Sequence, residues 1–355
     1  MLKALIFNPF GIGDVLFSMP LVRNLKENIK NILITYICNK RVYQLLKKNI
    51  FLDNVIVFEK DDYREYLKKS KILFLKKLFG FFNSLKKEKF DLVFDLSLNS
   101  QYGFFLKLLG IKMRIGYDFK NRGRFLTHKI KLVEGYNKKH VARYYLDLLK
   151  FLNINPKEYN FDIFLQEEEL KRQKILLNKF SCNDFLVGVF PGSGDSWGEN
   201  SYFKRWPEEN FVKLCNYLQD ELNANIILLG SESEKSLCDY VSFNLNKKCL
   251  NLCGKLNLNE LIHLLSLVKL VITNDGGPFH IAQALRKKTI VFFGPVDDNV
   301  YGKYLDLDNI FVFKKDIPCR PCYKNFKFKG CVYDKKCLKE ISTNEVISVL
   351  RELIF

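Results

Sequence analysis

The sequence predicts two doubly wound α/β domains, and two observations predict them. Short apolar runs rich in β-branched and aromatic residues alternate with amphipathic segments along nearly the whole chain. Such runs are typical of parallel strands covered on both faces of the sheet. The chain has 355 residues, about twice the usual size of one domain. The alternation therefore predicts two sheets.

The expected strands follow in order along the chain. In the first half they are KALIF (3–7), NILITYI (31–37), NVIVF (54–58) and DLVFDLSL (91–98). In the second half they are DFLVGVF (184–190), NIILLG (225–230), LVITND (270–275) and TIVFFG (289–294). The segment TNEVISVLRELIF then predicts a closing helix with one apolar side: Val346, Ile347, Val349, Leu350 and Leu353.

The boundary between the domains is expected at 160–170, where Pro156 precedes a charged helical pattern. We therefore expect an N-terminal domain at 1–165, a C-terminal domain at 166–340 and the closing helix at 341–355.

The chain is strongly basic, with a formal net charge of +18. Since 48% of its residues are hydrophobic, disorder is excluded and the positive charge belongs to a surface. Such a surface attracts nucleic acid, an anionic membrane face or phosphorylated small molecules, and charge alone does not choose among them.

Scattered cysteines and the lack of a secretory signal pattern indicate a reducing cytoplasm. No apolar run reaches the roughly 18 uncharged residues that span a bilayer, so we expect a soluble or peripheral protein. One segment stands outside the alternation: residues 66–87 combine seven lysines with many large apolar side chains. This segment is either a core-packed helix with a solvated lysine face or a helix that lies on an anionic membrane.

Ligands of open parallel sheets bind beyond the carboxyl ends of the strands, so the residues that follow each strand are the candidates. After the first strand comes Gly11-Ile12-Gly13-Asp14, a tight turn that leads into a helix. Asp14 either caps this helix or presents a carboxylate to the region between the domains.

Three strand ends of the second half carry groups suited to a nucleotide. The loop PGSGDSWGENSYFKRWPEENF brings Lys204 and Arg205 to the start of a helix, which suits phosphate, although a flexible surface loop is the alternative. Glu234 follows the next strand and could accept hydrogen bonds from a ribose or base. In Asn274-Asp275-Gly276-Gly277-Pro278-Phe279-His280, adjacent glycines and a helix N-terminus suit a diphosphate. His280 either donates to phosphate or is satisfied within the helix.

Five segments, in this order, resemble glycosyltransferase family 9, the ADP-heptose:lipopolysaccharide heptosyltransferases. They are GIGDVLFSMPLVRNLK, PGSG…FKRWPEENF, LLGSESE, LCGKLNLNELIHLLSLVKLVITNDGGPFHIAQALRKKTIVFFGP and PCRPC…C…CLKEIS. The resemblance implies a GT-B fold, in which two Rossmann-like domains face a central cleft and the closing helix returns to the first. It also implies inverting sugar transfer from ADP-heptose to a lipopolysaccharide inner core or related surface glycan, without a catalytic metal.

The resemblance also implies roles for single residues. Asp14 matches the general base, and Lys204 matches the lysine that contacts the donor phosphates. The other implied donor-binding residues are Gly13, Ser193, Glu234, Asp275, Gly276, Gly277 and His280. Lys204 and the helix N-terminus would stabilise charge that grows on the leaving phosphate. A carboxylate of ordinary pKa suffices as base, because the acceptor proton becomes acidic only as the new bond forms.

The family's acceptors are anionic glycolipids, which implies a peripheral place on the inner face of the cytoplasmic membrane. The segment KMRIGYDFKNRGR supplies cations that either contact acceptor phosphates or are merely solvated: Arg114, Lys120, Arg122 and Arg124. The late cysteines Cys319, Cys322, Cys331 and Cys337 suggest a structural zinc or iron site, with reduced thiols or redox use as alternatives.

Other functions are open on the sequence alone. Gly276 stands where a hydroxyl residue is common in the family, so another nucleotide sugar or a protein acceptor is an alternative within the enzyme class. A basic nucleic-acid-binding module is the alternative from another class. Because the expected phosphate contacts lie at strand ends, they favour a small ligand and not a nucleic acid. A degenerate member without turnover is disfavoured, since Asp14 and Lys204 are both present.

Overall fold

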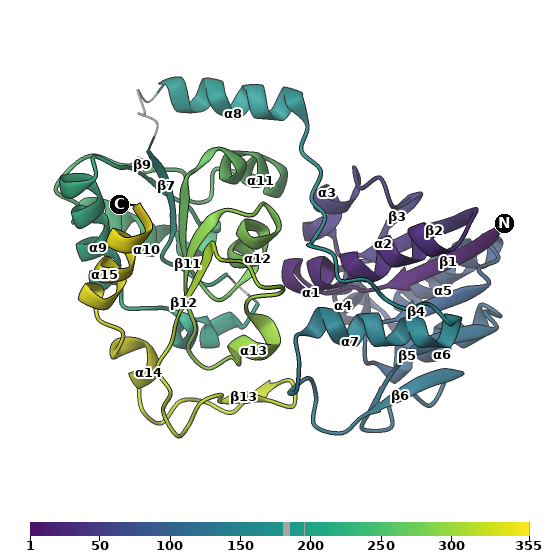
Figure 1. Ribbon diagram of the computed structural model, residues 1–355. Helices are drawn as coiled ribbons and strands as arrows, with labels where there is room; N and C mark the ends of the chain where they lie inside the picture. The colour runs from purple at the N-terminus through teal and green to yellow at the C-terminus, as the bar shows by residue number, and fades with distance from the viewer. Residues whose placement is uncertain (180–184, 195, 355) are drawn as a thin grey trace. The chain divides into compact units, whose positions relative to one another are not determined.

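The computed structural model describes residues 1–179, 185–194 and 196–354, and the chain divides into two compact units. The units are Met1–Phe164 and Leu165–Phe355, so the division falls one residue before the expected boundary. Figure 1 shows a sheet with helices in each unit.

The first unit contains a six-stranded parallel sheet in the order β3-β2-β1-β4-β5-β6. Its strands are β1 (Leu2–Phe7), β2 (Ile32–Cys38), β3 (Asn54–Val57), β4 (Leu92–Asp95), β5 (Met113–Phe119) and β6 (His128–Leu132). Strand β1 lies at the centre, and its last four residues are fully buried, which explains the continuous apolar run.

Helices cover both faces of this sheet (Figure 1). One face packs on α5 and α6, which bury Leu78, Phe82 and Leu106 against β1 and β4. Helices α1, α2 and α7 contact one another. The helices of the unit are α1 (Ile12–Phe17), α2 (Met19–Asn28), α3 (Tyr43–Leu46), α4 (Lys60–Lys69), α5 (Lys71–Lys87), α6 (Ser100–Leu108) and α7 (Val141–Asp147), with 3₁₀ turns η1 (Lys40–Val42) and η2 (Leu148–Leu152).

The second unit repeats the topology, with strand order β12-β11-β10-β7-β8-β9. Its parallel strands are β7 (Leu186–Phe190), β8 (Asn225–Leu228), β9 (Leu250–Asn251), β10 (Leu270–Asn274), β11 (Lys288–Phe292) and β12 (Ile310–Phe313). A separate antiparallel hairpin pairs β13 (Tyr323–Lys324) with β14 (Lys327–Phe328).

The helices of the second unit form layers around this sheet. A large core joins strands β7, β8, β10 and β11 to helices on one face, with Trp206, Phe211 and Phe292 at its centre. The helices are α8 (Glu167–Lys179), α9 (Glu208–Glu221), α10 (Lys235–Phe243), α11 (Leu258–Leu267), α12 (Gly277–Ala284), α13 (Asp298–Tyr301), α14 (Lys336–Lys339) and α15 (Thr343–Ile354), with 3₁₀ turns η3 (Gly198–Lys204) and η4 (Glu232–Glu234).

The closing helix α15 is described within the second unit, and its expected return to the first domain stays a prediction. It groups with the second unit and packs against α9. Its Val346 and Leu350 are fully buried in the core of that unit. These two residues of the apolar side are therefore buried within the second unit.

Four strands of the two sheets were not expected from the sequence: β5, β6, β9 and β12. Strand β6 alternates charged and apolar residues, and β9 has two residues, so neither forms a conspicuous apolar run. Three of the four, β6, β9 and β12, lie at the edges of their sheets, where a strand pairs with a neighbouring strand on one side only. Among the described residues, no helix is long and apolar enough to cross a membrane.

The strand order that the two sheets share predicts where each unit binds a ligand. The strand order reverses between β1 and β4 in the first unit and between β7 and β10 in the second. At such a switch point the loops diverge and leave a crevice beyond the carboxyl ends of the strands. The chain reaches these points at Asp14 and Asp95 in the first unit, and at Lys204 and Asp275 in the second.

Candidate active site

The loops that follow β7 and β10 are tied together by the buried side chain of Asn274. Its amide nitrogen donates to the carbonyl oxygens of Pro191 (2.9 Å) and Gly192 (2.8 Å). Its amide oxygen accepts a hydrogen bond from the backbone N–H of Trp206 at 2.8 Å. Asn274 thus fixes both ends of the loop that carries Lys204.

Lys204 and Asp275 form a buried ion pair at this switch point. The Nζ of Lys204 lies 2.8 Å from Oδ2 of Asp275, and the two side chains are 7% and 6% exposed. The ammonium also lies 5.0 Å from the centre of the Trp197 ring. The ammonium of Lys204 therefore lies beside the start of α12, paired with the Asp275 carboxylate, where a phosphate could also bind it.

The N-terminus of α12 completes a group of donors suited to an anion. Gly276 is the N-cap residue and Gly277 begins the helix. A Cβ added at Gly276 would lie 3.0 Å from the carbonyl oxygen of Ser193, so the loops after β7 and β10 touch here. The hydroxyl of Ser193 donates to the carbonyl oxygen of Ser201 and stabilises the Lys204 loop from within.

His280 lies in the first turns of α12 and is buried. Burial and the nearby charge of Lys204 lower the pKa of His280 to about 3. The imidazole is therefore neutral at physiological pH and can offer a hydrogen bond but no charge.

Glu234, the expected nucleoside contact, has backbone partners on two loops. Its Oε1 accepts a hydrogen bond from the backbone N–H of Gly194 at 2.8 Å, and Oε2 accepts one from the N–H of Ser231 at 2.9 Å. A Cβ on Gly192 would come within 1.9 Å of Oε1. The buried carboxylate therefore joins the loop after β7 to the start of α10, and Gly192 leaves it the room.

Aromatic rings support the Lys204 loop from the segment that carries the late cysteines. The ring of Trp197 lies 5.1 Å from that of Tyr323 and 5.0 Å from that of Phe328, centre to centre. Phe328 also contacts Phe203, at 5.4 Å. The rings of the β13–β14 hairpin thus pack against Trp197 and Phe203, which precede Lys204 in the loop.

In the first unit, Asp14 lies in the first turn of α1, directly beyond the end of β1. Burial raises its pKa from the ordinary 3.8 to about 6, while the charge of Lys60 and the backbone N–H groups of Gly11 and Asp14 oppose the rise. Gly11, not Asp14, is the N-cap residue of this helix. The carboxylate therefore lies at a helix N-terminus and has a pKa suited to accepting a proton near neutrality.

A buried polar network holds the turn behind Asp14. The amide nitrogen of Asn8 donates to the carbonyl oxygen of Asp14 at 3.0 Å and to the Tyr36 hydroxyl at 2.9 Å. That hydroxyl lies 2.7 Å from the hydroxyl of Ser18. The position of Asp14 is thus set by side chains from β1, β2 and the α1–α2 junction.

Two further groups lie at the same edge of the first sheet. Lys60 begins α4, and its Nζ lies 4.4 Å from the Phe10 ring centre and 5.8 Å from that of Tyr102. Asp95 ends β4, and burial raises its pKa to about 6 although it accepts hydrogen bonds from the N–H and hydroxyl of Ser97. The first unit therefore places two carboxyls of raised pKa at its switch point.

The four expected acceptor cations separate into two kinds. The guanidinium of Arg114 donates to the backbone carbonyls of Ile111, before β5, and of Phe125, in the turn between β5 and β6. Lys120, Arg122 and Arg124 are exposed in that turn, where they lie near the rings of Phe119 and Phe125. Arg114 is half-buried, whereas the other three are exposed.

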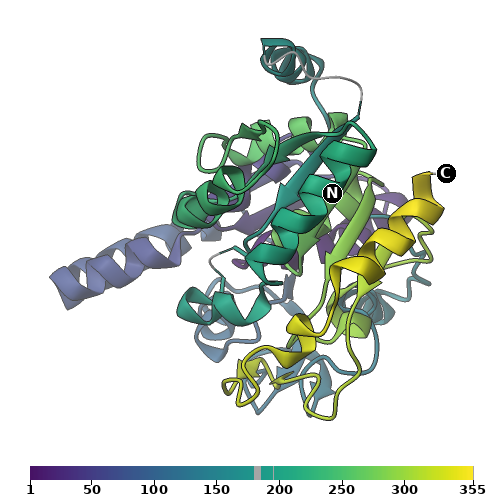
Figure 2. The ribbon, with the colours of Figure 1, turned by 90° about the vertical axis from the view of Figure 1, so that its left-hand side faces the viewer.

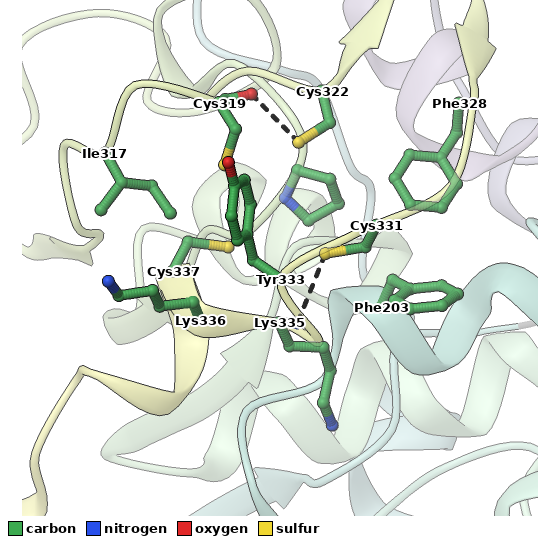
Figure 3. Close-up of a pocket in the computed structure, with 11 residues that line it drawn as sticks. Phe203, Ile317, Cys319, Cys322, Phe328, Cys331, Tyr333, Lys335, Lys336 and Cys337 are labelled. Carbon is green, nitrogen blue, oxygen red and sulfur yellow. Dashed lines mark hydrogen bonds between the residues drawn. The ribbon is translucent and has the colours of Figure 1, made fainter.

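The four late cysteines line one pocket, together with aromatic and lysine side chains (Figure 3). The Sγ of Cys322 donates to the carbonyl oxygen of Cys319, and the N–H of Lys335 donates to the Sγ of Cys331. Thiols suit zinc or iron by their chemistry. Among the residues that the structure describes, however, no three such side chains converge at metal-binding distance.

Sequence reasoning missed Asn274, Lys60 and Trp197. The sequence does contain a signal for Asn274, because this polar residue ends a buried apolar strand. No local signal identified Trp197 or Lys60, because their partners come from distant segments.

Two Rossmann-like units with the same strand order are the architecture of the GT-B class of glycosyltransferases. Residues 78–332 match the family described as "Glycosyltransferase family 9 (heptosyltransferase)". The match covers more than half of the chain, and the chain belongs to this family. The expectations of family and of enzyme class are confirmed.

Two curated relatives match this chain over nearly its whole length. Lipooligosaccharide heptosyltransferase 2 of Campylobacter jejuni is 26% identical over 359 residues, which cover 99% of this chain and 98% of the relative. Lipopolysaccharide heptosyltransferase 1 of Campylobacter coli is 24% identical over 369 residues, with 99% of each covered.

Solved structures confirm the expected fold class. A glycosyl transferase family 9 protein from Veillonella parvula has a TM-score of 0.81 at 21% identity, covering 99% of this chain and 96% of that one. ADP-heptose lps heptosyltransferase II of E. coli has a TM-score of 0.76 at 20% identity, with 99% and 98% covered. An iron-containing glycosyltransferase of E. coli, TibC, has a TM-score of 0.58 at 13% identity, with 99% and 75% covered.

Proposed function

We propose that this glycosyltransferase moves a heptose from ADP-heptose to an acceptor hydroxyl of a lipopolysaccharide inner core or a related surface glycan. The observation that carries the proposal is the buried Lys204–Asp275 pair beside the start of α12, at the switch point of the second unit. The ammonium of Lys204 and the backbone N–H groups at the start of α12 can bind a nucleotide diphosphate. The family and the names of the full-length relatives support heptose as the sugar.

The reaction follows from what each group can do. The acceptor oxygen bonds to the anomeric carbon while the bond from that carbon to the diphosphate oxygen breaks, and ADP leaves with the electron pair. Lys204 and the α12 N-terminus stabilise the negative charge that grows on the phosphate. Asp14 accepts the acceptor proton as the new bond forms. A single displacement inverts the configuration at the anomeric carbon.

The remaining site residues divide between donor and acceptor. Gly13, Ser193 and Glu234 act mainly through the backbone they shape, whereas Gly277 and neutral His280 can offer hydrogen bonds to the donor. For the acceptor, Lys120, Arg122 and Arg124 are exposed cations suited to the phosphates of an anionic glycolipid. Such an acceptor would place the enzyme in the cytoplasm, peripherally on the inner face of the membrane.

The test measures ADP release from ADP-heptose with an inner-core glycolipid acceptor, for the wild type and for Asp14→Asn. We expect acceptor-dependent release that Asp14→Asn lowers by at least a hundredfold with donor binding retained. Release with another nucleotide sugar, and none with ADP-heptose, would overturn the donor assignment. Lack of any donor binding would overturn the enzyme assignment and leave the nucleic-acid alternative.

For the cysteine pocket, we propose a structural zinc or iron ion held by Cys319, Cys322, Cys331 and Cys337. The four thiols around one pocket and the iron-containing fold relative support it, and binding requires side-chain rotation from the described positions. The ion would stabilise the segment beneath Trp197. Elemental analysis should find about one ion per chain, lost in Cys319→Ser with Cys322→Ser; four free thiols and no metal would refute it.

A further inference from the structure

Helices α4 and α5 form a pair in which a long stretch is helical without being buried. No residue from Glu59 to Lys77 is buried, although the stretch contains large apolar side chains. Tyr63 and Phe74 are partly buried against the core, whereas full burial begins at Leu78 and continues at Phe82 and Leu85. Figure 2 shows a blue helix of this part of the chain extending outward.

The exposed side of α5 is apolar. Ile72 is 79% exposed, Leu75 is 47% exposed and Phe79 is 53% exposed, and their spacing of three and four residues places them on one helix face. Helix α6 carries two more exposed apolar side chains, Phe104 and Leu108, which are 42% and 50% exposed. The two helices touch through Phe105, whose ring lies 6.2 Å from that of Phe79.

We call this surface the α5–α6 apolar patch: Ile72, Leu75, Phe79, Phe104 and Leu108. A contiguous group of exposed large apolar side chains on a soluble unit marks an interaction site, whereas single exposed side chains need no explanation. None of the five residues is a candidate donor, acceptor or catalytic residue, and the proposed reaction does not use them.

The charge around the patch indicates its partner. Between Tyr66 and Lys87 the chain has seven lysines and no acidic residue. All seven are exposed, and Lys68, Lys69 and Lys71 lie at the turn between the helices. Lysines flanking an apolar helix face suit a bilayer, where the apolar side chains enter the acyl boundary and the ammonium groups remain at anionic headgroups. A second copy is disfavoured because two such surfaces would oppose like charges.

We infer that the α5–α6 apolar patch and its lysines dock the enzyme on an anionic lipid bilayer. The inference deepens the proposed function, because a glycolipid acceptor lies in such a bilayer. Docking near the acceptor raises its local concentration at the first unit, where Asp14 lies.

The test is sedimentation with vesicles of phosphatidylglycerol and phosphatidylcholine, compared with phosphatidylcholine alone. Wild-type protein should bind the anionic vesicles, and added salt should weaken binding. The variant Ile72→Ser, Leu75→Ser, Phe79→Ser should lose at least tenfold in partitioning without loss of folding, because none of the three is buried. The control Ile175→Ser, Phe243→Ser removes side chains that are 58% and 89% exposed in the second unit, and it should bind as the wild type does.

Two further measurements make the result decisive. ADP release with a water-soluble acceptor fragment should be equal in both variants and the wild type. If vesicle binding is unchanged in the α5 variant while ADP release continues, the docking inference fails and the proposed function stands. If vesicles bind through the patch but no donor is consumed, the proposed function fails alone. A concentration-dependent dimer in solution that the α5 variant abolishes, without vesicle binding, would identify a second copy as the partner and overturn the inference.

Discussion

Substitution of Lys204 by Met should destabilise the second unit sharply while leaving the first intact. The change keeps most of the side-chain volume and removes the charge, so the Asp275 carboxylate remains buried without its partner at 2.8 Å. Breaking a buried ion pair at one end costs about 3–5 kcal/mol. For a unit of this size, each kcal/mol lowers Tm by about 2–4 °C. The expected fall in Tm is therefore about 6–20 °C.

Tryptophan fluorescence reports this unit selectively, because both tryptophans of the chain, Trp197 and Trp206, lie in it. Thermal and urea unfolding followed by this signal give Tm and the free energy of unfolding. The matched control is Lys303→Met, which breaks a pair with fully exposed Asp306 and should cost about 1 kcal/mol or less.

A double variant, Lys204→Met with Asp275→Leu, separates stability from function. Replacing both partners by apolar groups of similar shape removes the stranded charge, so at least half of the lost stability should return. ADP release should stay at least about a hundredfold below the wild type, since the phosphate-stabilising charge is absent. The ion-pair argument fails if Lys204→Met is no less stable than Lys303→Met, or if the double variant is less stable than the single one.

Three other predictions rest on single groups. Because the pKa of Asp14 is about 6 and a base must be ionised, kcat/KM for ADP release should fall about tenfold per pH unit below pH 6; a flat profile from pH 5 to 8 would exclude Asp14 as the base. Asp95 has a pKa of about 6 in the folded protein and an ordinary value of 3.8 when unfolded. Its ionisation therefore lowers the free energy of unfolding as pH rises from 3.8 to 6. Asp95→Asn should raise the free energy of unfolding by up to about 3 kcal/mol at pH 8 and leave it unchanged near pH 3.5, as urea unfolding at the two pH values can check. In Gly192→Ala the new Cβ would lie 1.9 Å from Oε1 of Glu234, so the carboxylate must move; we expect a loss of about 1–3 kcal/mol in the free energy of unfolding and a higher KM for the donor. The control Gly80→Ala, with open space around it, should change neither quantity. Equal Tm and KM values for the two variants would contradict the packing.

The main strands and three of the candidate loops could be predicted from the sequence, because their signals are local. A buried strand is a short apolar run, and a ligand loop is a polar or glycine-rich stretch directly after it. For this reason Asp14, Lys204 and Asp275 were placed at strand ends, where the structure has them. The edge strands β6 and β9 lack the apolar run and escaped the same reasoning.

Residue type predicted candidate ligand contacts, but it did not predict the protein partners of the same side chains. The guanidinium of Arg114 donates to the carbonyl groups of Ile111 and Phe125. The carboxylate of Glu234 accepts hydrogen bonds from the N–H groups of Gly194 and Ser231. The expected roles of both residues in ligand binding stay predictions.

By itself, the sequence determined the α/β class, the repeated use of parallel strands and the identity of the groups at their ends, because these follow from periodicity and from the residue that comes next. Tertiary structure decided which of those groups meet. The pairing of Lys204 with Asp275 and the hydrogen bond from Trp206 to Asn274 join segments 68 or more residues apart. Such contacts depend on strand order in the sheet, which no local pattern specifies, and strand order is what creates the switch points where the chemistry gathers.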